Sequence, residues 1–341
     1  MKKSFLLIII LLVSITINIL GGDTNRKGTS GAQELLIPVG ARSIASGGSF
    51  LSSVTGLEAI YYNPAGLDLM NGSEVMFSYM NYLADISLSY FAVGTQLGEF
   101  GSLAFSYKTL GFGEIPVTTF DNPEGTGETY SPEYNVITLT FGKKLTDRVS
   151  AGVNFKYVHE GIMNASANGM AIDFGVQYKF NQNFSIGTAV KNVGTNMSFT
   201  GEDLKVKSEV PGSGLGSGSG VYQADTEPFQ IPSYFELSVA YRLDVNEENF
   251  LSLATAFKNN NSFEDEMGFG LEYNYTNMFF LRGGYNLLLQ NTNESIYDFT
   301  LGAGINYQTK DGVTFAFDYA FRNVKEFPTA NHVFTVKLGL E

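Results

Sequence analysis

Hydrophobic and polar residues alternate along much of the chain after residue 72. In the stretch 313–322, which reads VTFAFDYAFR, every odd-numbered position is apolar or aromatic, whereas the even-numbered positions carry Thr, Ala, Asp, Ala and Arg. The stretches 297–308 and 334–341 alternate in the same way. Because successive side chains of a strand point to opposite faces, this period of two predicts strands with one apolar face.

Segments of this kind occur fourteen times, and their second face is rich in Gly, Asn, Thr and isolated charges. Strands that are apolar outside and polar or small inside suit a membrane, where hydrocarbon forces them to close into a ring. We therefore predict an all-β fold, a 14-stranded antiparallel transmembrane β-barrel over residues 73–341. The predicted strands lie near 74–82, 86–97, 101–112, 133–144, 148–160, 169–180, 183–193, 231–243, 249–258, 266–275, 278–288, 296–308, 312–322 and 332–341.

The links between these strands alternate between short and long, except that the link 83–85 is short where a long one is expected. Short turns such as 98–101 and 276–277 alternate with longer links such as 113–132 and 194–230. Outer-membrane barrels have short periplasmic turns and long outer loops, whereas a soluble sandwich, the alternative, has no reason to show this asymmetry. The even number of strands also predicts that both termini are periplasmic.

Two long links are candidates for binding a partner. The link 113–132 carries Val117 and Phe120 beside turn residues, so we expect it to fold over the pore or against a partner. The link 194–230 contains a Gly/Ser run at 211–220, which predicts a mobile surface loop, with a partner-binding arm as the alternative.

Charged side chains at inner-face positions are the candidates for a role inside the barrel. They would form either a structural network that holds a plug or a path for transport. These lumen-facing candidates are Asp173, Glu236, Arg242, Glu272, Arg282, Asp318 and Arg322.

The first 22 residues have the features of a secretory signal peptide. Lys2 and Lys3 precede an apolar run that starts at Phe5, and small residues follow at 21 and 22. A membrane anchor helix is the alternative, but three polar residues interrupt the run.

Residues 23–72 are too apolar and too ordered in pattern for a tail. Val54, Leu57 and Ile60 fall at helical spacing, which predicts a short helix before a rigid turn. A fourteen-stranded ring is wider than its own side chains fill, so we expect this segment to plug the lumen; a periplasmic cap is the alternative. The expected turn is Asn63, Pro64, Ala65 and Gly66, and the expected hinge is Gly47 and Gly48.

Composition agrees with strands and excludes several classes of protein. The chain has 28 Phe, 19 Tyr, 38 Gly and no Trp, and only 16% of its residues are charged. The absence of Cys excludes disulfides and a lipoprotein anchor, and the net charge of −13 argues against nucleic acid as a partner. With two separated histidines and no catalytic or metal-binding motif, we expect no enzyme activity, no metal and no cofactor.

Several blocks of the chain resemble the PorV/PorQ family of outer-membrane proteins, part of the wider FadL-type group. These blocks are PVGARSIASGGSFLSS, EAIYYNPAGL, YLADISLSYFAVGTQLGEFGSLAFSYKTLGFGEIPVTT, GKKLTDRVSAGVNFKYVHEGI, AIDFGVQYKF and AVKNVGTNM. The likeness runs from about residue 35 to the C-terminus, and the NPAG corner maps onto residues 63–66. The resemblance implies a fourteen-stranded barrel with an N-terminal segment in its lumen.

Three functions follow as hypotheses. The resemblance favours an outer-membrane accessory of type IX protein secretion, which binds the translocon, secreted cargo proteins or both. The alternative is a FadL-like channel that takes up long-chain fatty acids or other hydrophobic small molecules past a plug. A purely structural barrel is the third. An apolar pocket lined by residues such as Val54, Ile60 and Tyr61 would favour transport, whereas a packed lumen would favour docking.

Overall fold

The structure is a computed structural model of the chain, and it describes residues 28–209 and 219–340. The predicted signal peptide and most of the Gly/Ser run lie outside the described residues. Among the helices of the described residues, none combines the length and hydrophobicity needed to cross a membrane.

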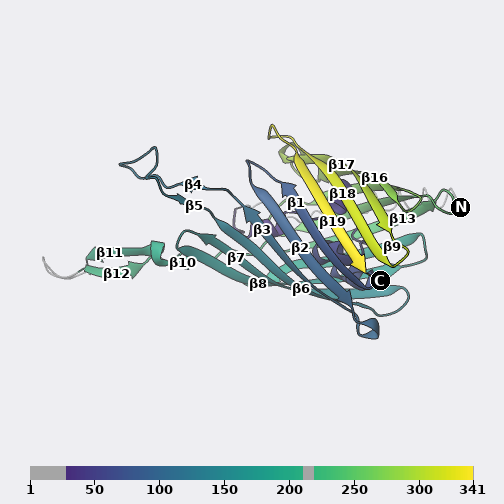
Figure 1. Cartoon of the computed structure of the whole chain (residues 1–341). Coiled ribbons are helices and arrows are strands. Elements are labelled where there is room, and N and C mark those ends of the chain that lie inside the picture. The colour runs from purple at the N-terminus through teal and green to yellow at the C-terminus, as the bar shows by residue number, and fades with distance from the viewer. Residues whose placement is uncertain (1–27, 210–218, 341) are drawn as a thin grey trace.

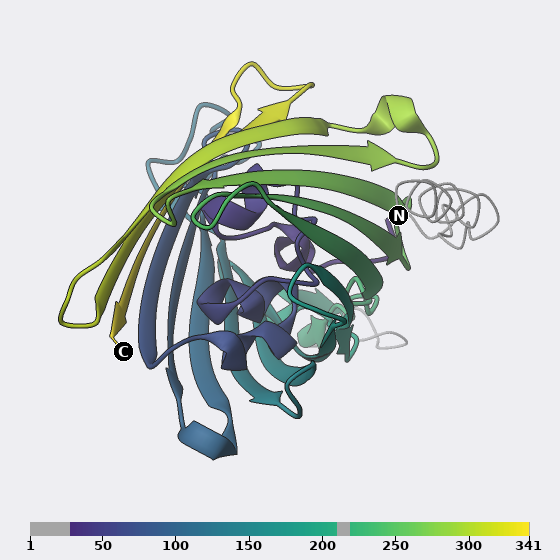
Figure 2. The same ribbon diagram turned by 90° about the vertical axis from the view of Figure 1, so that its right-hand side faces the viewer.

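Fourteen long antiparallel strands form a closed barrel, as predicted (Figures 1 and 2). Consecutive long strands pair with each other, and β1 pairs with β19 to close the ring. A short strand, β10 (Thr200–Gly201), adds to the edge of β8. The long strands are β1 (Ser73–Asn81), β2 (Ser87–Gln96), β3 (Ser102–Gly111), β6 (Glu133–Lys144), β7 (Val149–Ile162), β8 (Ala165–Lys179), β9 (Phe184–Gly194), β13 (Tyr234–Asp244), β14 (Phe250–Asn260), β15 (Glu266–Tyr275), β16 (Phe279–Leu288), β17 (Tyr297–Gln308), β18 (Val313–Val324) and β19 (Asn331–Leu340).

Apolar side chains face outward along these strands, and small or polar ones face inward. In β1, Phe77 is 50% exposed, whereas its neighbours Met76 and Ser78 are fully buried. The outward Phe77 lies beside Phe91 of β2 and Val336 of β19. The alternation in the sequence therefore becomes an apolar outer belt and a lumen of mixed polarity.

One predicted loop is wrong. The stretch 161–168 was expected to be an outer link, but β7 continues to Ile162 and β8 begins at Ala165. Met163, with a φ of 52°, makes the tight turn between them. Small and polar residues in this stretch suggest a loop, yet the two strands pair as far as Ile162 and Ala165.

All the long connections lie at one end of the barrel, which we name the loop end, together with the short β1–β2 and β7–β8 turns. The other end, which we name the turn end, carries short connections. The long connections hold η8 (Thr292–Glu294), η7 (Glu202–Leu204) and two small hairpins. These hairpins are β4 (Ile115–Pro116) with β5 (Thr129–Tyr130), and β11 (Lys205–Glu209) with β12 (Ser219–Gln223). The turn end holds η6 (Gly98–Phe100).

Residues 28–72, which we name the hatch, lie inside the ring of strands (Figure 2). Ser30 pairs with Gln230 at the loop end, whereas Asp68 accepts a hydrogen bond from the Lys144 backbone N near the turn end. The first described residues therefore lie at the end opposite to the one where β19 finishes. The hatch contains η3 (Gln33–Leu36), α2 (Ala41–Ala45), η4 (Gly56–Glu58), α3 (Ala59–Tyr62) and η5 (Pro64–Leu69).

Inward-facing glycines let the hatch backbone touch the barrel wall. A Cβ on Gly152 of β7 would lie 2.3 Å from the Pro64 carbonyl, and one on Gly284 of β16 would lie 2.3 Å from the Gly47 N. Real Cβ atoms do not approach so closely, so only glycine fits. We name these inward positions the glycine belt: Gly94, Gly142, Gly152, Gly175, Gly187, Gly268, Gly270, Gly284 and Gly302.

Substituting a glycine of this belt should loosen the hatch. We expect Gly152→Ala to destabilise the folded barrel by roughly 1–3 kcal/mol, because the added methyl group overlaps the Pro64 carbonyl. Gly283→Ala is the matched control, since a Cβ there would meet nothing closer than 3.8 Å. The measurement is the temperature at which the folded form disappears on semi-native gels. Equal midpoints for the two variants would contradict the close contact.

Candidate functional site

All seven predicted lumen charges lie on the inner face of the barrel, but at different depths. Asp173 is fully buried, where it pairs with Lys156 at 2.6 Å and accepts a hydrogen bond from Asn154. Arg242 instead lies at the turn end, about half exposed, and pairs with Asp244 at 2.7 Å. Sequence parity assigns the face of a strand correctly, but it carries no information about depth.

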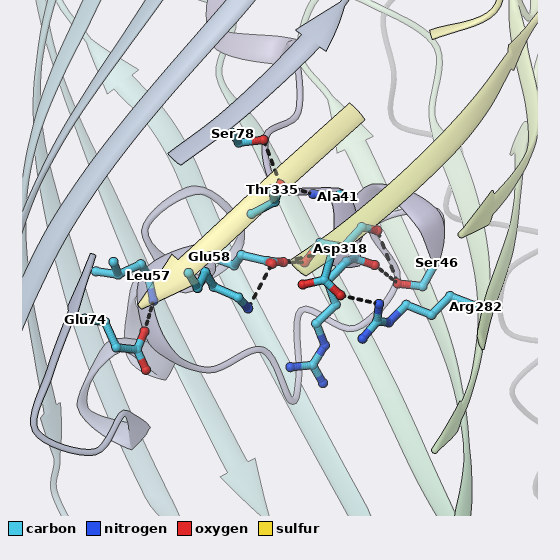
Figure 3. Close-up of polar contacts among 12 residues, drawn as sticks. Ala41, Ser46, Leu57, Glu58, Glu74, Ser78, Arg282, Asp318 and Thr335 are labelled. Carbon is cyan, nitrogen blue, oxygen red and sulfur yellow. Dashed lines mark hydrogen bonds and ion pairs between the residues drawn. The ribbon is translucent and has the colours of Figure 1, made fainter. Parts of the chain in front are cut away.

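A chain of four charged side chains joins the hatch to three strands. Arg42 of α2 approaches Glu272 of β15 to 3.1 Å, and Arg282 of β16 contacts the same carboxylate at 2.6 Å. Arg282 also pairs with Asp318 of β18 at 2.6 Å (Figure 3). Buried charges are costly unless paired, so this alternation of sign stabilises the hatch in one position.

The hatch is also held by a carboxylate that the sequence did not single out. Glu58, which is 1% exposed, accepts hydrogen bonds from the Ser43 N and hydroxyl and pairs with Lys337 of β19 at 3.4 Å. Beside it, the Ala41 N donates to Thr335 Oγ1 at 2.8 Å (Figure 3). Glu58 lies in the predicted hatch helix, and its burial depends on contacts distant in sequence.

The predicted turn at residues 63–66 anchors the hatch at the turn end. Asn63 is the N-cap of η5, and its side-chain oxygen accepts a hydrogen bond from the Ala65 N at 3.2 Å. Its Nδ2 donates to the carbonyls of Leu51 in the hatch and Val176 in β8. Gly66 is required here because a Cβ would lie 2.0 Å from the Val54 carbonyl. The corner therefore binds both the hatch and the wall.

Buried lysines and tyrosines meet at mid-barrel. The Lys191 Nζ lies 4.2 Å from the centre of the Tyr61 ring and 5.0 Å from that of Tyr234, and it donates to the Tyr61 carbonyl. Lys108 donates to the carbonyls of Glu34 and Ile37 at 2.5 and 2.6 Å. Burial raises the pKa of the Tyr61 hydroxyl well above its ordinary value, so this phenol stays neutral. No pattern in the sequence predicts this cluster.

A cavity opens among the loop-end connections. It has a volume of about 440 Å³ and is lined by the hatch, by Phe263 and by residues 294–297. A smaller cavity of about 90 Å³ adjoins it on the side of the barrel interior, and we name this smaller cavity the floor. The floor is lined by Gly47, Gly48 and Tyr61. Leu36, Pro38, Lys258, Glu266, Asn286 and Arg322 line both spaces, which we name together the loop-end cavity.

A second cavity lies at the turn end and is separated from the first. It has a volume of about 510 Å³ and is lined by Arg42, Phe50, Ser53 and Arg242. It shares no lining residue with the loop-end cavity, because residues 46–53 of the hatch lie between them. Gly47 and Gly48, with φ values of 64° and 68°, make the tight turn in this partition.

The interior between the cavities is packed. Val54 and Ile60 are 7% and 2% exposed, and neither lines one of the cavities described above. Tyr61 lines only the floor of the loop-end cavity. Within the described ranges, no group of three or more His, Cys, Asp or Glu side chains is placed to hold a metal ion.

The loop-end hairpins extend away from the barrel rather than over its opening (Figure 1). In the β4–β5 arm, the Val117 N donates to the Glu128 carbonyl at 2.9 Å and the Thr126 N donates to the Val117 carbonyl at 2.8 Å. Phe120, near the tip of this arm, is fully exposed. An ordered arm with an exposed aromatic near its tip has the form of an interaction anchor.

Comparison with known proteins identifies a family for most of the barrel. A family model described as "Type IX secretion system membrane protein PorP/SprF" matches residues 130–338. The search of curated proteins finds no match. The match supports kinship with type IX secretion proteins, while the more specific resemblance to PorV/PorQ stays a prediction.

Several solved structures share the fold. The Pseudomonas putida toluene transporter TodX matches with a TM-score of 0.53 and 14% identity over 88% of this chain and 97% of its own. A Pseudomonas aeruginosa FadL homologue matches with a TM-score of 0.52 and 12% identity over 89% and 98%. The Ralstonia pickettii toluene transporter TbuX matches with a TM-score of 0.51 and 14% identity over 88% and 97%. At these identities the likeness concerns the FadL-like fold alone.

Stability should fall as the pH rises through neutrality, because of one hatch carboxyl. Burial, followed by the neighbouring Glu160 carboxylate, raises the pKa of Glu34 from 4.5 to about 8. Between these values the folded state keeps a proton that the unfolded state has released, so raising the pH favours unfolding. We expect the thermal midpoint to fall over this range in the wild type and to fall less in Glu34→Gln. Glu99→Gln, at an exposed position, is the control; a parallel fall in all three proteins would refute the assignment.

Removal of the hatch should open the barrel. We expect the protein without residues 32–72 to conduct ions in planar bilayers, because these residues separate the two cavities. The full-length protein should conduct far less. If the shortened barrel folds yet conducts no more than the full-length protein, the hatch is not the plug.

Proposed function

Because the chain belongs to the type IX secretion system membrane protein PorP/SprF family, we propose that it is an outer-membrane accessory of type IX protein secretion. In this proposal it binds the translocon, secreted cargo proteins or both, and carries out no catalytic step. The loop end faces the cell surface, and the C-terminus lies in the periplasm.

The observation that carries the proposal is the family match over residues 130–338, which extends from the end of the β4–β5 arm to β19. The packed hatch adds support, because docking needs a firm scaffold and a filled lumen provides one. The same hatch weighs against an open channel, since residues 46–53 separate the two cavities.

The β4–β5 arm is the proposed docking element. Residues 113–132 contain four acidic residues and no Lys or Arg, so the arm suits a partner surface with basic residues around an apolar pocket. Phe120 would fill that pocket, with Val117 beside it at the base of the tip. An aromatic at the centre of such a contact contributes much of the binding energy.

Uptake of long-chain fatty acids or other hydrophobic small molecules is the second candidate. The observation in its favour is the loop-end cavity, whose lining includes Leu36, Leu110, Phe112 and Ile296. Uptake would require residues 46–53 to move before a molecule could pass from this cavity to the turn end.

Purification of the native protein from detergent-solubilised outer membrane tests the proposal. Recovery of a very large barrel protein or of secreted proteins would support the accessory role. Copurifying fatty acids without protein partners would support uptake and contradict the accessory role.

Loss of one aromatic should weaken the docking. We expect Phe120→Ala to reduce partner recovery about tenfold or more, as truncation of an interface anchor does. Phe100→Ala is the matched control, because Phe100 is 63% exposed but lies at the turn end. Equal recovery with both variants would contradict docking through the β4–β5 arm.

A further inference from the structure

An apolar groove lies in the outer face of the barrel wall near the turn end, and we name it the wall groove. It has a volume of about 560 Å³, within the range of about 300–1,000 Å³ that is typical of ligand sites. Its sides are outward side chains of β2, β3, β6 and β7, among which Leu103, Leu139 and Phe155 are 45%, 57% and 55% exposed. Its floor is shallow in side chains, because Gly94 of β2 pairs there with Ala104 of β3. The wall groove is therefore a depression in the apolar belt that faces lipid.

Two hydroxyl groups mark the edge of the wall groove nearest the turn end. Ser73 of β1 and Thr95 of β2 line the groove, and their hydroxyl oxygens lie 2.8 Å apart. They belong to the same row of paired positions as Leu103 and Phe141. Lys143 lies two residues beyond Phe141 along β6, on the same outer face. The lining thus changes from apolar to polar to charged towards the turn end.

The turn beside the wall groove carries an excess of positive charge in an acidic chain. Residues 143–148 read KKLTDR, whereas the whole chain has a net charge of −13. Asp147 pairs with Lys144 at 3.1 Å, and Lys143 and Arg148 form no ion pair within the described part of the chain. The neighbouring turn, 97–101, adds one acidic residue, Glu99, which does not offset both cations. Two basic side chains are therefore available to an anionic group just beyond the groove.

We propose that the wall groove and residues 143–148 bind an anionic phospholipid of the leaflet on the turn-end side. One acyl chain lies in the groove, the glycerol esters approach the hydroxyls of Ser73 and Thr95, and the headgroup lies beside Lys143 and Arg148. Basic side chains at a membrane surface attract anionic lipids. A phosphate oxygen also accepts charge-assisted hydrogen bonds from Lys and Arg, which are stronger than neutral ones.

A lipid suits the wall groove better than an extended segment of a partner protein does. The backbone groups of β2, β3, β6 and β7 already pair with one another, so a peptide laid across them would find no partners for its own N–H and C=O groups. Such groups are costly to leave unpaired at the depth of the hydrocarbon. An acyl chain has no hydrogen-bonding groups and fills the depression without this cost.

The test places one tryptophan in a chain that has none. Phe155→Trp puts the reporter in the wall of the groove. Phe279→Trp is the matched control, because Phe279 is 45% exposed at the turn-end start of β16 and residues 275–281 carry no charge. The full-length protein is reconstituted in phosphatidylcholine bilayers that contain brominated phosphatidylglycerol or brominated phosphatidylcholine, since bromine quenches the fluorescence of an adjacent indole.

Brominated phosphatidylglycerol should bind preferentially at one reporter alone. We expect it to compete about fivefold more strongly than brominated phosphatidylcholine at Phe155→Trp, because one basic side chain at a membrane surface contributes about that much to the attraction of an anionic lipid. At Phe279→Trp the two lipids should quench equally. High salt should reduce the preference at Phe155→Trp, as it screens exposed charges.

Charge variants then locate the headgroup. In the Phe155→Trp protein, Lys143→Gln together with Arg148→Gln should abolish the preference for phosphatidylglycerol, whereas Lys143→Arg should retain it. Lys310→Gln is the control, since Lys310 is an exposed cation of the turn between β17 and β18 and should leave the preference unchanged. Gel mobility of the unheated protein shows whether each variant is folded.

Three outcomes would overturn the proposal. The first is equal quenching by the two brominated lipids at Phe155→Trp, and the second is the same preference at both reporters; neither depends on a charge variant that folds. The third is no quenching by either lipid at Phe155→Trp, which would assign the groove to a second copy of the chain. None of these results bears on the β4–β5 arm, so recovery of secretion partners would still support the accessory role.

Discussion

Contact between the hatch backbone and the glycine belt is the constraint on which the rest of the structure depends. Strands in a membrane must form a closed ring, because hydrocarbon cannot satisfy an open sheet edge. A ring of fourteen strands leaves an interior too wide for its own side chains to fill. Because Gly152, Gly187 and Gly284 have no side chain, the hatch packs against the wall through its own backbone. The abundance of glycine, which weakens strands in general, is here the condition for a filled lumen.

The paired charges act on top of this packing. Arg42, Glu272, Arg282 and Asp318 alternate in sign across the hatch and three strands, so each buried charge has a partner. Removing one of these side chains would leave the neighbouring buried charge unpaired, which would destabilise the folded protein by about 3–5 kcal/mol. Hydrogen bonding in the interior is less complete than this charge pairing, because buried atoms such as Tyr62 Oη, Gln177 Oε1 and Arg322 Nη1 have no hydrogen-bond partner among the described residues.

Much of the fold could be predicted from alternation alone, because a period of two fixes which face of each strand meets lipid. The fourteen strands follow from it, whereas the FadL-type kinship rests on the resemblance of several sequence blocks. Depth could not be predicted: Arg242 and Arg282 share the inward face, yet one is half exposed and the other is buried. The Lys191 and Tyr61 contact and the Glu58 site also depend on residues brought together from distant parts of the chain. The kinship with type IX secretion proteins is confirmed by the family match, and the finer assignment to PorV/PorQ stays a prediction.

The hydrogen bonds that hold the partition between the two cavities determine how easily a passage through the barrel could open. Residues 49–54 accept hydrogen bonds from wall side chains: Ser238 donates to the Ser49 carbonyl at 2.6 Å, and Gln177 donates to those of Leu51 and Val54 at 3.0 and 2.9 Å. Opening a passage would break these bonds, and each buried group left unpaired costs about 1–3 kcal/mol. A transporter would need ligand binding to offset that cost in every cycle. A docking protein needs the partition to stay closed, so the contacts that oppose transport are the ones that hold its loop end in shape.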